Sequence, residues 1–231
     1  MNKTLVISKT ERHLKRYYRW NSHLYDTTRW AILWGRKWLG DYLRSELEEL
    51  SKKNPTAPST PCIVEIGCGT GFHLSALAPV FKNSVFYGFD ASTHMLNKAY
   101  KKIHKLKNVQ LREEYFSSNS LQDSSVDCFI CSYSMSMNEN IPTLIESIHQ
   151  NMKDSGVLYI VDFLSTSSDW FYRWMMLHGV YIHSEIIVEL QNTFESVEYE
   201  SKRGFFGLFR YGVVKAIKQK KSDLHRLVLV L

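Results

Sequence analysis

The sequence predicts an α/β protein with a Rossmann-like, doubly wound sheet of seven mostly parallel strands and an N-terminal helical extension. Short apolar runs alternate with segments of helical periodicity five times. This order is typical of parallel sheets covered by helices on both faces. A glycine cluster at residues 67–71 follows the first run, and two strand-like segments joined at Arg203-Gly204 end the core.

Length and charge limit the classes of protein to consider. The 231 residues are 44% hydrophobic, which suits one domain with added elements. The net charge of +6 suits an anionic membrane or an acidic partner, but also an ordinary solvated surface. No run reaches the ~20 apolar residues of a spanning helix, and residues 1–16 lack the apolar centre of a secretion signal. We expect a cytoplasmic protein, with peripheral contact at the inner membrane left open.

Residues 10–54 have helical periodicity and predict an N-terminal helical cap over residues 1–54, within the same domain. Its apolar stripe has two rows, Ala31, Trp34, Trp38, Tyr42 and Leu39, Leu43, Leu47, Leu50. We expect the stripe, including Trp34 and Trp38, to pack in the core. Residues 51–61 predict a linker because they contain prolines and lysines without an apolar pattern.

The remaining chain predicts a core over residues 61–218 and a loosely ordered tail over 219–231. Expected strands are 62–66, 84–90, 109–116, 126–132, 156–162, 194–202 and 208–218, and expected helices are 72–81, 95–103, 141–152 and 184–191. An aromatic insertion at 164–183 interrupts this order. Cys128 and Cys131 lie three apart on a strand and should face opposite sides, so we expect no metal site and four reduced cysteines.

The glycine cluster predicts a cofactor site. Gly67 and Gly69 allow a tight turn and a close approach of backbone to a ligand. Phe72 stands where a dinucleotide fingerprint has its last glycine, which disfavours a nicotinamide cofactor. Asp90 ends the next strand, where a carboxylate can accept hydrogen bonds from both ribose hydroxyls. Glu65 is placed either to orient the turn and reach the cofactor or to cap backbone amides.

This strand, glycine turn and acid resemble motif I and the following acidic motif of class I S-adenosylmethionine-dependent methyltransferases. The resemblance implies S-adenosylmethionine as cofactor, S-adenosylhomocysteine as product, and adenine near Met95 and residues 114–116. The chain departs from the family at Glu114-Tyr115-Phe116, where an Asp usually contacts adenine. The expected cofactor-binding residues are Tyr18, Arg36, Glu65, Gly67, Cys68, Gly69, Asp90, Met95, Tyr115, Phe116 and Ser132.

Three further segments resemble the N-methyltransferase of bacterial betaine-lipid synthesis. They are residues 18–29 with Gly35-Arg36, residues 132–137, and residues 161–163 with 171–178. The resemblance covers nearly the whole chain. It implies methylation of the amino group of diacylglyceryl-homoserine to a trimethylammonium, and hence a role in lipid metabolism.

Amine methylation needs a neutral nucleophile, so the site must lower the amine pKa or accept its proton. The candidate catalytic residues are Tyr25, Tyr133 and His178, with Asp26 as a further proton acceptor. Arg29 and Arg36, seven apart on one predicted helix face, could bind the carboxylate of the cofactor or of homoserine. Asp162, at the carboxyl end of a strand, is an expected substrate contact.

Several alternatives remain open. The acceptor could be phosphatidylethanolamine, a small amine or a hydroxyl group, although a hydroxyl acceptor favours metal ligands that the sequence does not show. The protein could also bind the cofactor without catalysis. Nucleic acid is disfavoured because Ser134-Met-Ser-Met137 replaces the Asn/Asp-Pro-Pro-aromatic motif. Residues 170–182 fit either an interfacial membrane segment or a lid, and the oligomeric state is open.

Overall fold

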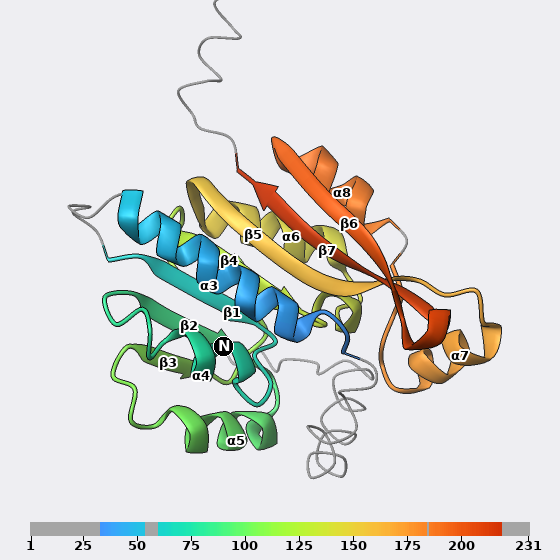
Figure 1. Ribbon diagram of the computed structural model, residues 1–231, viewed down its shortest axis with the longest axis horizontal. Coiled ribbons are helices and arrows are strands. Elements are labelled where there is room, and N and C mark those ends of the chain that lie inside the picture. The colour runs from blue at the N-terminus through green and yellow to red at the C-terminus, as the bar shows by residue number, and fades with distance from the viewer. Residues whose placement is uncertain (1–32, 54–59, 184, 219–231) are drawn as a thin grey trace, which may run out of the picture.

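The computed structural model describes residues 33–53, 60–183 and 185–218. Seven strands form one sheet in the order β3-β2-β1-β4-β5-β7-β6 (Figure 1). The strands are β1 (Cys62–Ile66), β2 (Val85–Phe89), β3 (Val109–Arg112), β4 (Val126–Ser132), β5 (Met152–Ser165), β6 (Ser196–Gly204) and β7 (Phe209–Ile217). The first five strands pair in parallel, and β7 runs antiparallel to both β5 and β6. The predicted fold class is confirmed.

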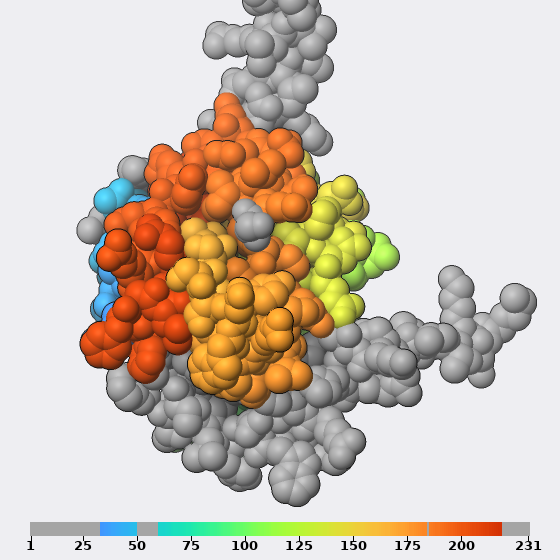
Figure 2. Space-filling model, turned by 90° about the vertical axis from the view of Figure 1, so that its right-hand side faces the viewer, coloured from blue at the N-terminus to red at the C-terminus, as the bar shows by residue number. Residues whose placement is uncertain are grey.

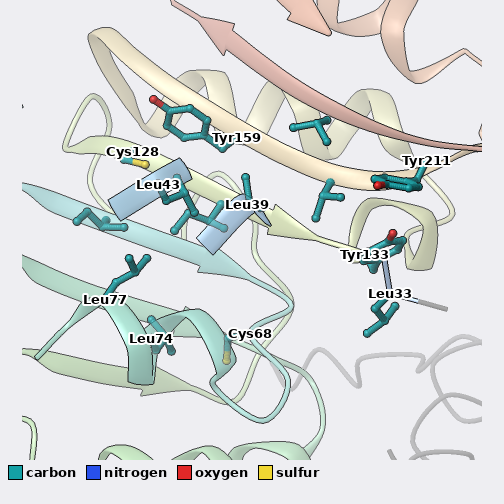
Figure 3. Close-up of a cluster of buried hydrophobic side chains, with 14 of the residues drawn as sticks. Leu33, Leu39, Leu43, Cys68, Leu74, Leu77, Cys128, Tyr133, Tyr159 and Tyr211 are labelled. Carbon is teal, nitrogen blue, oxygen red and sulfur yellow. The ribbon is translucent and has the colours of Figure 1, made fainter. Parts of the chain in front are cut away.

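Helices cover both faces of the sheet (Figure 1). They are α3 (Arg36–Lys53), α4 (Phe72–Leu77), α5 (Thr93–Ile103), α6 (Ile141–Asn151), α7 (Asp169–Leu177) and α8 (Ile186–Thr193). Side chains of α3, α4, α5 and α7 enter one buried cluster, and those of α6 and α8 enter the other. Figure 3 shows Leu39 and Leu43 of α3 between Leu74 of α4 and Tyr159 of β5.

The N-terminal helix corrects two expectations. Leu39, Leu43 and Leu47 are buried as expected, but Trp34 and Trp38 are 38% and 41% exposed. The leucine row faces the sheet, so Trp38 lies beside it and its ring stacks on Tyr42 at 5.1 Å. Gly35, with φ +84°, precedes the first helical residue, Arg36. The described helix therefore begins at Arg36, after a turn at residues 34–35, and the predicted partner Arg29 lies outside the described residues.

Element ends follow long-range pairing more than local pattern. The strand predicted over 109–116 ends at Arg112, because its partner β2 ends at Phe89 and the two residues form the last pair. Strand β5 begins at Met152, four residues before the predicted start, with a register shift where it pairs with β4. Cys128 and Cys131 lie in separate buried clusters, so they face opposite sides of the sheet as predicted. No helix in the described ranges is long and apolar enough to cross a membrane.

Candidate cofactor site at the carboxyl ends of the strands

The turn after β1 depends on two glycines with different surroundings. Gly67 has φ +68°, and a Cβ there would lie 2.5 Å from Cβ of Ser134, just after β4. Gly69 has φ +54°, and a Cβ there would meet no atom within 4 Å. The first glycine therefore lets β1 and β4 approach each other, whereas the second leaves open space beside the backbone.

Asp90 connects this turn to the end of β2. Its Oδ2 accepts a hydrogen bond from the Gly69 amide at 2.9 Å, and its Oδ1 accepts one from the Ser92 amide at 2.8 Å. Burial raises the pKa of Asp90 to about 6, although both amides favour the charged form. A carboxylate has about four acceptor positions. Two of them remain for hydroxyl donors.

A cavity opens at the carboxyl ends of β1, β2 and β4. The expected cofactor-binding residues that line it are Gly67, Asp90, Met95, Tyr115, Phe116 and Ser132, and the expected catalytic residue Tyr133 also lines it. Among the described residues, Asp90 and Glu114 are the charged members of the lining, and none of the described lining residues is Lys, Arg or His. The cavity therefore combines aromatic rings with negative charge.

Unpaired polar groups lie buried at the glycine turn. In the part of the chain that the structure describes, Oε2 of Glu65, both ring nitrogens of His73 and Nε of Arg36 have no hydrogen-bond partner. Burial raises the pKa of Glu65 to about 8 and lowers the pKa of His73 to about 3. The guanidinium of Arg36 lies 4.4 Å from the centroid of the Phe72 ring. Such groups are costly unless a ligand or water pairs with them.

Tyr133 adopts a left-handed backbone conformation, with φ +55°, directly after β4. Its hydroxyl donates a hydrogen bond to the carbonyl of Trp34. Burial raises the pKa of this hydroxyl far above its ordinary value, so it stays protonated at neutral pH. A left-handed residue with a Cβ is costly and is often found at functional sites. The Tyr133 hydroxyl is thus a neutral group that cannot accept a proton as a phenolate.

Asp162 does not lie in the cavity, where a substrate contact was expected. Its side chain is 2% exposed and does not line the cavity. Its carboxylate accepts hydrogen bonds from the amides of Ser136 at 3.0 Å and Phe163 at 2.8 Å. Asp162 therefore fixes the segment after β4, whose residues Ser134, Met137 and Asn138 line the cavity.

The other predicted residues lie away from the cavity or outside the described ranges. His178 follows α7, with Nδ1 2.6 Å from the Trp174 carbonyl, and does not line the cavity. The Cys68 side chain is buried in the hydrophobic cluster, although its amide belongs to the turn. Tyr18, Tyr25 and Arg29 lie outside the described residues.

Sequence reasoning assigned Tyr133 to the site but not the next cavity-lining residues, Ser134, Met137 and Asn138, and it did not single out His73. The position of Ser134, Met137 and Asn138 could have been found, because strands adjacent in a parallel sheet end at the same edge. The insertion also reaches this edge: the Tyr181 amide donates to the Ser136 carbonyl at 2.6 Å, and His183 Nε2 lies 3.0 Å from the Asn138 carbonyl.

Known proteins share this sequence pattern and fold. O-methyltransferase 3 of Dictyostelium discoideum is 28% identical over 111 residues, which cover 44% of this chain and 25% of that protein. Phosphoethanolamine N-methyltransferase 2 of Haemonchus contortus, solved with phosphomonomethylethanolamine and S-adenosylhomocysteine, superposes with a TM-score of 0.64 at 16% identity, covering 90% of this chain and 60% of that one. The CurJ carbon methyltransferase gives 0.65 at 16% identity, covering 91% and 67%.

The chain spans no more than 39% of the length of the curated relatives that it matches. The likeness to solved structures, at these identities, shows the fold. A family described as a methyltransferase domain matches residues 36–209, which include the glycine turn, Asp90 and the segment after β4. The chain therefore belongs to this methyltransferase domain family, whose cofactor is S-adenosylmethionine.

Proposed function

We propose that this protein transfers the methyl group of S-adenosylmethionine to the amino group of a lipid headgroup, with diacylglyceryl-homoserine as the acceptor. The observation that carries the proposal is the charge of the cavity. The described residues of its lining include two acidic side chains and several aromatic rings, and none of them is basic. Such a surface favours cations, and both the sulfonium cofactor and a methylated ammonium are cations.

The residues present fit the cofactor. Asp90 keeps two acceptor positions for the ribose hydroxyls, and the open space beside Gly69 admits a ligand against the backbone. Met95, Tyr115 and Phe116 would hold the adenine. Glu65 and Arg36 would receive the ammonium and carboxylate of the methionine part, which would pair their unpartnered atoms. When bound, S-adenosylmethionine supplies the electrophilic methyl group.

The acceptor side follows from Tyr133 and the segment after β4. Since the Tyr133 hydroxyl donates to the Trp34 carbonyl, its oxygen can accept a hydrogen bond from an amine N–H and orient the nitrogen lone pair. Tyr25 is the proposed proton acceptor, because it belongs to a segment that resembles N-methyltransferases. His178 belongs to another such segment but does not line the cavity. Asp162 holds the Ser134–Met137 segment in place and is a positioning residue.

An amine acceptor occurs within this fold, as the name of the Haemonchus contortus phosphoethanolamine enzyme states. The Dictyostelium discoideum relative is named for O-methylation and the CurJ enzyme for carbon methylation. The fold is therefore compatible with nitrogen, oxygen and carbon acceptors. The acidic, aromatic cavity favours the amine.

The test uses the purified full chain with methyl-labelled S-adenosylmethionine. Separate reactions contain vesicles of diacylglyceryl-homoserine in phosphatidylcholine, vesicles of phosphatidylethanolamine, free homoserine, and free phosphoethanolamine. We expect label in the homoserine lipid. Label in phosphatidylethanolamine, or only in a soluble amine, would identify that compound as the acceptor in place of the homoserine lipid. Cofactor binding without label in any of the reactions would overturn the amine proposal.

Tyr133→Phe tests the acceptor side, with Tyr211→Phe as the matched control because Tyr211 does not line the cavity. We expect Tyr133→Phe to lower kcat by about tenfold or more, with cofactor affinity and thermal stability close to those of the control. Equal turnover in both variants would remove the Tyr133 hydroxyl from the chemistry.

A further inference from the structure

The sheet has an exposed apolar end, far along the chain from the glycine turn. Four apolar residues of α7 are exposed: Trp170 by 70%, Tyr172 by 41%, Met176 by 43% and Leu177 by 73%. At the tip of the β6–β7 hairpin, Phe205 is 40% exposed and Phe206 is 100% exposed. These six residues are called the apolar end below. Soluble proteins usually bury such side chains, and gathered exposure marks an interaction surface.

Helix α7 and the hairpin tip lie side by side, as Figures 1 and 2 both show. The Phe171 ring of α7 stacks on the Phe209 ring of β7, with centroids 5.7 Å apart. The Thr166 hydroxyl, just before α7, donates to the Leu208 carbonyl at 2.7 Å. The two parts of the apolar end are therefore held together by buried contacts behind it.

The hairpin tip holds its two phenylalanines in an unfavourable backbone conformation. Phe205 has φ +40° and Phe206 has φ +53°, followed by Gly207 at φ +89°. Residues with a Cβ disfavour this left-handed region, where Gly or Asn is common in turns. Neither ring is buried in the protein. Folding alone therefore gives no reason for two phenylalanines at this turn.

Basic side chains stand directly behind the phenylalanines. Arg203 of β6 and Arg210 of β7 are paired across the hairpin, and both are exposed. Like charges directly opposite each other on neighbouring strands are destabilising. Within the described ranges neither arginine forms an ion pair, and Arg210 donates to Ser201 instead. Arg173 lies exposed on α7, with Asp169 as the acidic residue of that helix.

We propose that the apolar end docks the protein on an anionic lipid bilayer, with Phe205 and Phe206 entering the acyl boundary and Arg203, Arg210 and Arg173 meeting the headgroups. The phenylalanines at the hairpin tip match the apolar layer of a membrane surface, and the arginines on the adjoining strands match its charged headgroup layer. A second copy of the chain fits less well, because a symmetric contact through this end would bring the arginines of both copies together.

This docking would place the acceptor side of the cavity near the lipid headgroups. The segment after α7 is hydrogen-bonded through Tyr181 to Ser136 and through His183 to Asn138, and Asn138 lines the cavity. The proposal goes beyond the proposed function. It concerns the surface that binds the bilayer, whichever headgroup is methylated.

The experiment is flotation of the purified full chain with phosphatidylcholine vesicles, with and without phosphatidylglycerol, and without cofactor or acceptor. We expect binding to the mixed vesicles that weakens at high salt. The double variant Phe205→Ser, Phe206→Ser should bind at least about tenfold less tightly, and Arg203→Gln about fivefold less tightly. Tyr199→Ser is the control, because Tyr199 is 52% exposed on the same hairpin but away from its tip.

Absence of binding to the mixed vesicles would overturn the proposal, as would equal binding by the double variant, the control and the unmodified chain. A dimer that the double variant disperses, without vesicle binding, would assign the apolar end to a contact between copies and overturn it too. Unchanged cofactor affinity in all variants shows that they fold. Vesicle binding needs no methyl transfer, so it persists if the proposed function alone fails.

Discussion

The edge of the sheet with the glycine turn and the cavity, called the cofactor edge below, differs from the apolar end in the kind of side chain that is out of its usual place. The cofactor edge buries polar groups, and the apolar end exposes apolar ones. At the cofactor edge, Oε2 of Glu65 and both ring nitrogens of His73 are buried without hydrogen-bond partners in the described part of the chain. At the apolar end, Phe206 and Trp170 are 100% and 70% exposed. Both arrangements raise the free energy of the folded protein. Each cost is offset by what the region is proposed to bind, which is the methionine part of the cofactor beside Glu65 in one case and a bilayer in the other.

The two regions also differ in which residues adopt a left-handed backbone conformation. At the cofactor edge it is carried mainly by glycines, and Gly67 in addition leaves no room for a Cβ beside Ser134. At the hairpin tip it is carried by Phe205 and Phe206. Substitutions at the first region should therefore damage the fold, whereas substitutions at the second should spare or improve it.

The largest expected effect is that of Gly67→Ala. The new Cβ adopts a left-handed conformation and meets Ser134, so we expect a loss of about 2 to 5 kcal/mol in the free energy of unfolding. Gly69→Ala is the matched control, since its Cβ meets no atom within 4 Å. It should lose about 1 to 2 kcal/mol. Denaturant unfolding of both variants measures the difference, and equal losses would show that the contact with Ser134 is unimportant.

The buried Glu65 predicts a pH dependence of stability. Its pKa is about 8 in the folded chain because of burial, and near the ordinary value of about 4.3 in the unfolded chain. The folded state binds the proton more tightly, so the stabilisation is complete below about pH 4.3 and is lost as the pH rises through 8. Between pH 6 and pH 9, the free energy of unfolding of the unmodified protein should fall by about 2 to 3 kcal/mol more than that of Glu65→Gln. Parallel curves for the two proteins, measured without cofactor, would contradict this prediction.

Cofactor affinity should depend on the charge of Asp90. We expect Asp90→Asn to weaken S-adenosylmethionine binding by about tenfold or more at neutral pH, because hydrogen bonds to a charged acceptor contribute about 1.5 to 3 kcal/mol. Since the pKa of Asp90 is about 6 in the ligand-free protein, affinity should fall as the pH drops below 6. Calorimetric titration of both proteins across this range measures the effect. If the affinity of Asp90→Asn depends on pH in the same way as that of the unmodified protein, a group other than Asp90 causes the dependence.

The smallest effect is expected at the hairpin tip. Phe206→Asn should raise the free energy of unfolding by about 0.5 to 1 kcal/mol, because Asn tolerates the left-handed conformation and the lost ring is exposed. Tyr199→Asn is the control, since Tyr199 is an exposed aromatic residue in extended β6. Its stability should stay equal or fall slightly in thermal unfolding. A loss of stability in Phe206→Asn would mean that the ring packs against the protein.

The sequence by itself determined the sheet, the glycine turn and the position of Asp90. Alternating apolar periods fix strands and helices locally, and consecutive parallel strands end at one edge, so neighbours in the chain become neighbours in the site. Only the tertiary structure decided which face Trp38 occupies and that Ser134 lies against Gly67. It also decided that the His73 ring is buried without a hydrogen-bond partner among the described residues, and that Arg203 lies opposite Arg210. These features depend on strand register and on contacts between residues far apart in the chain, and a local pattern carries no information about either.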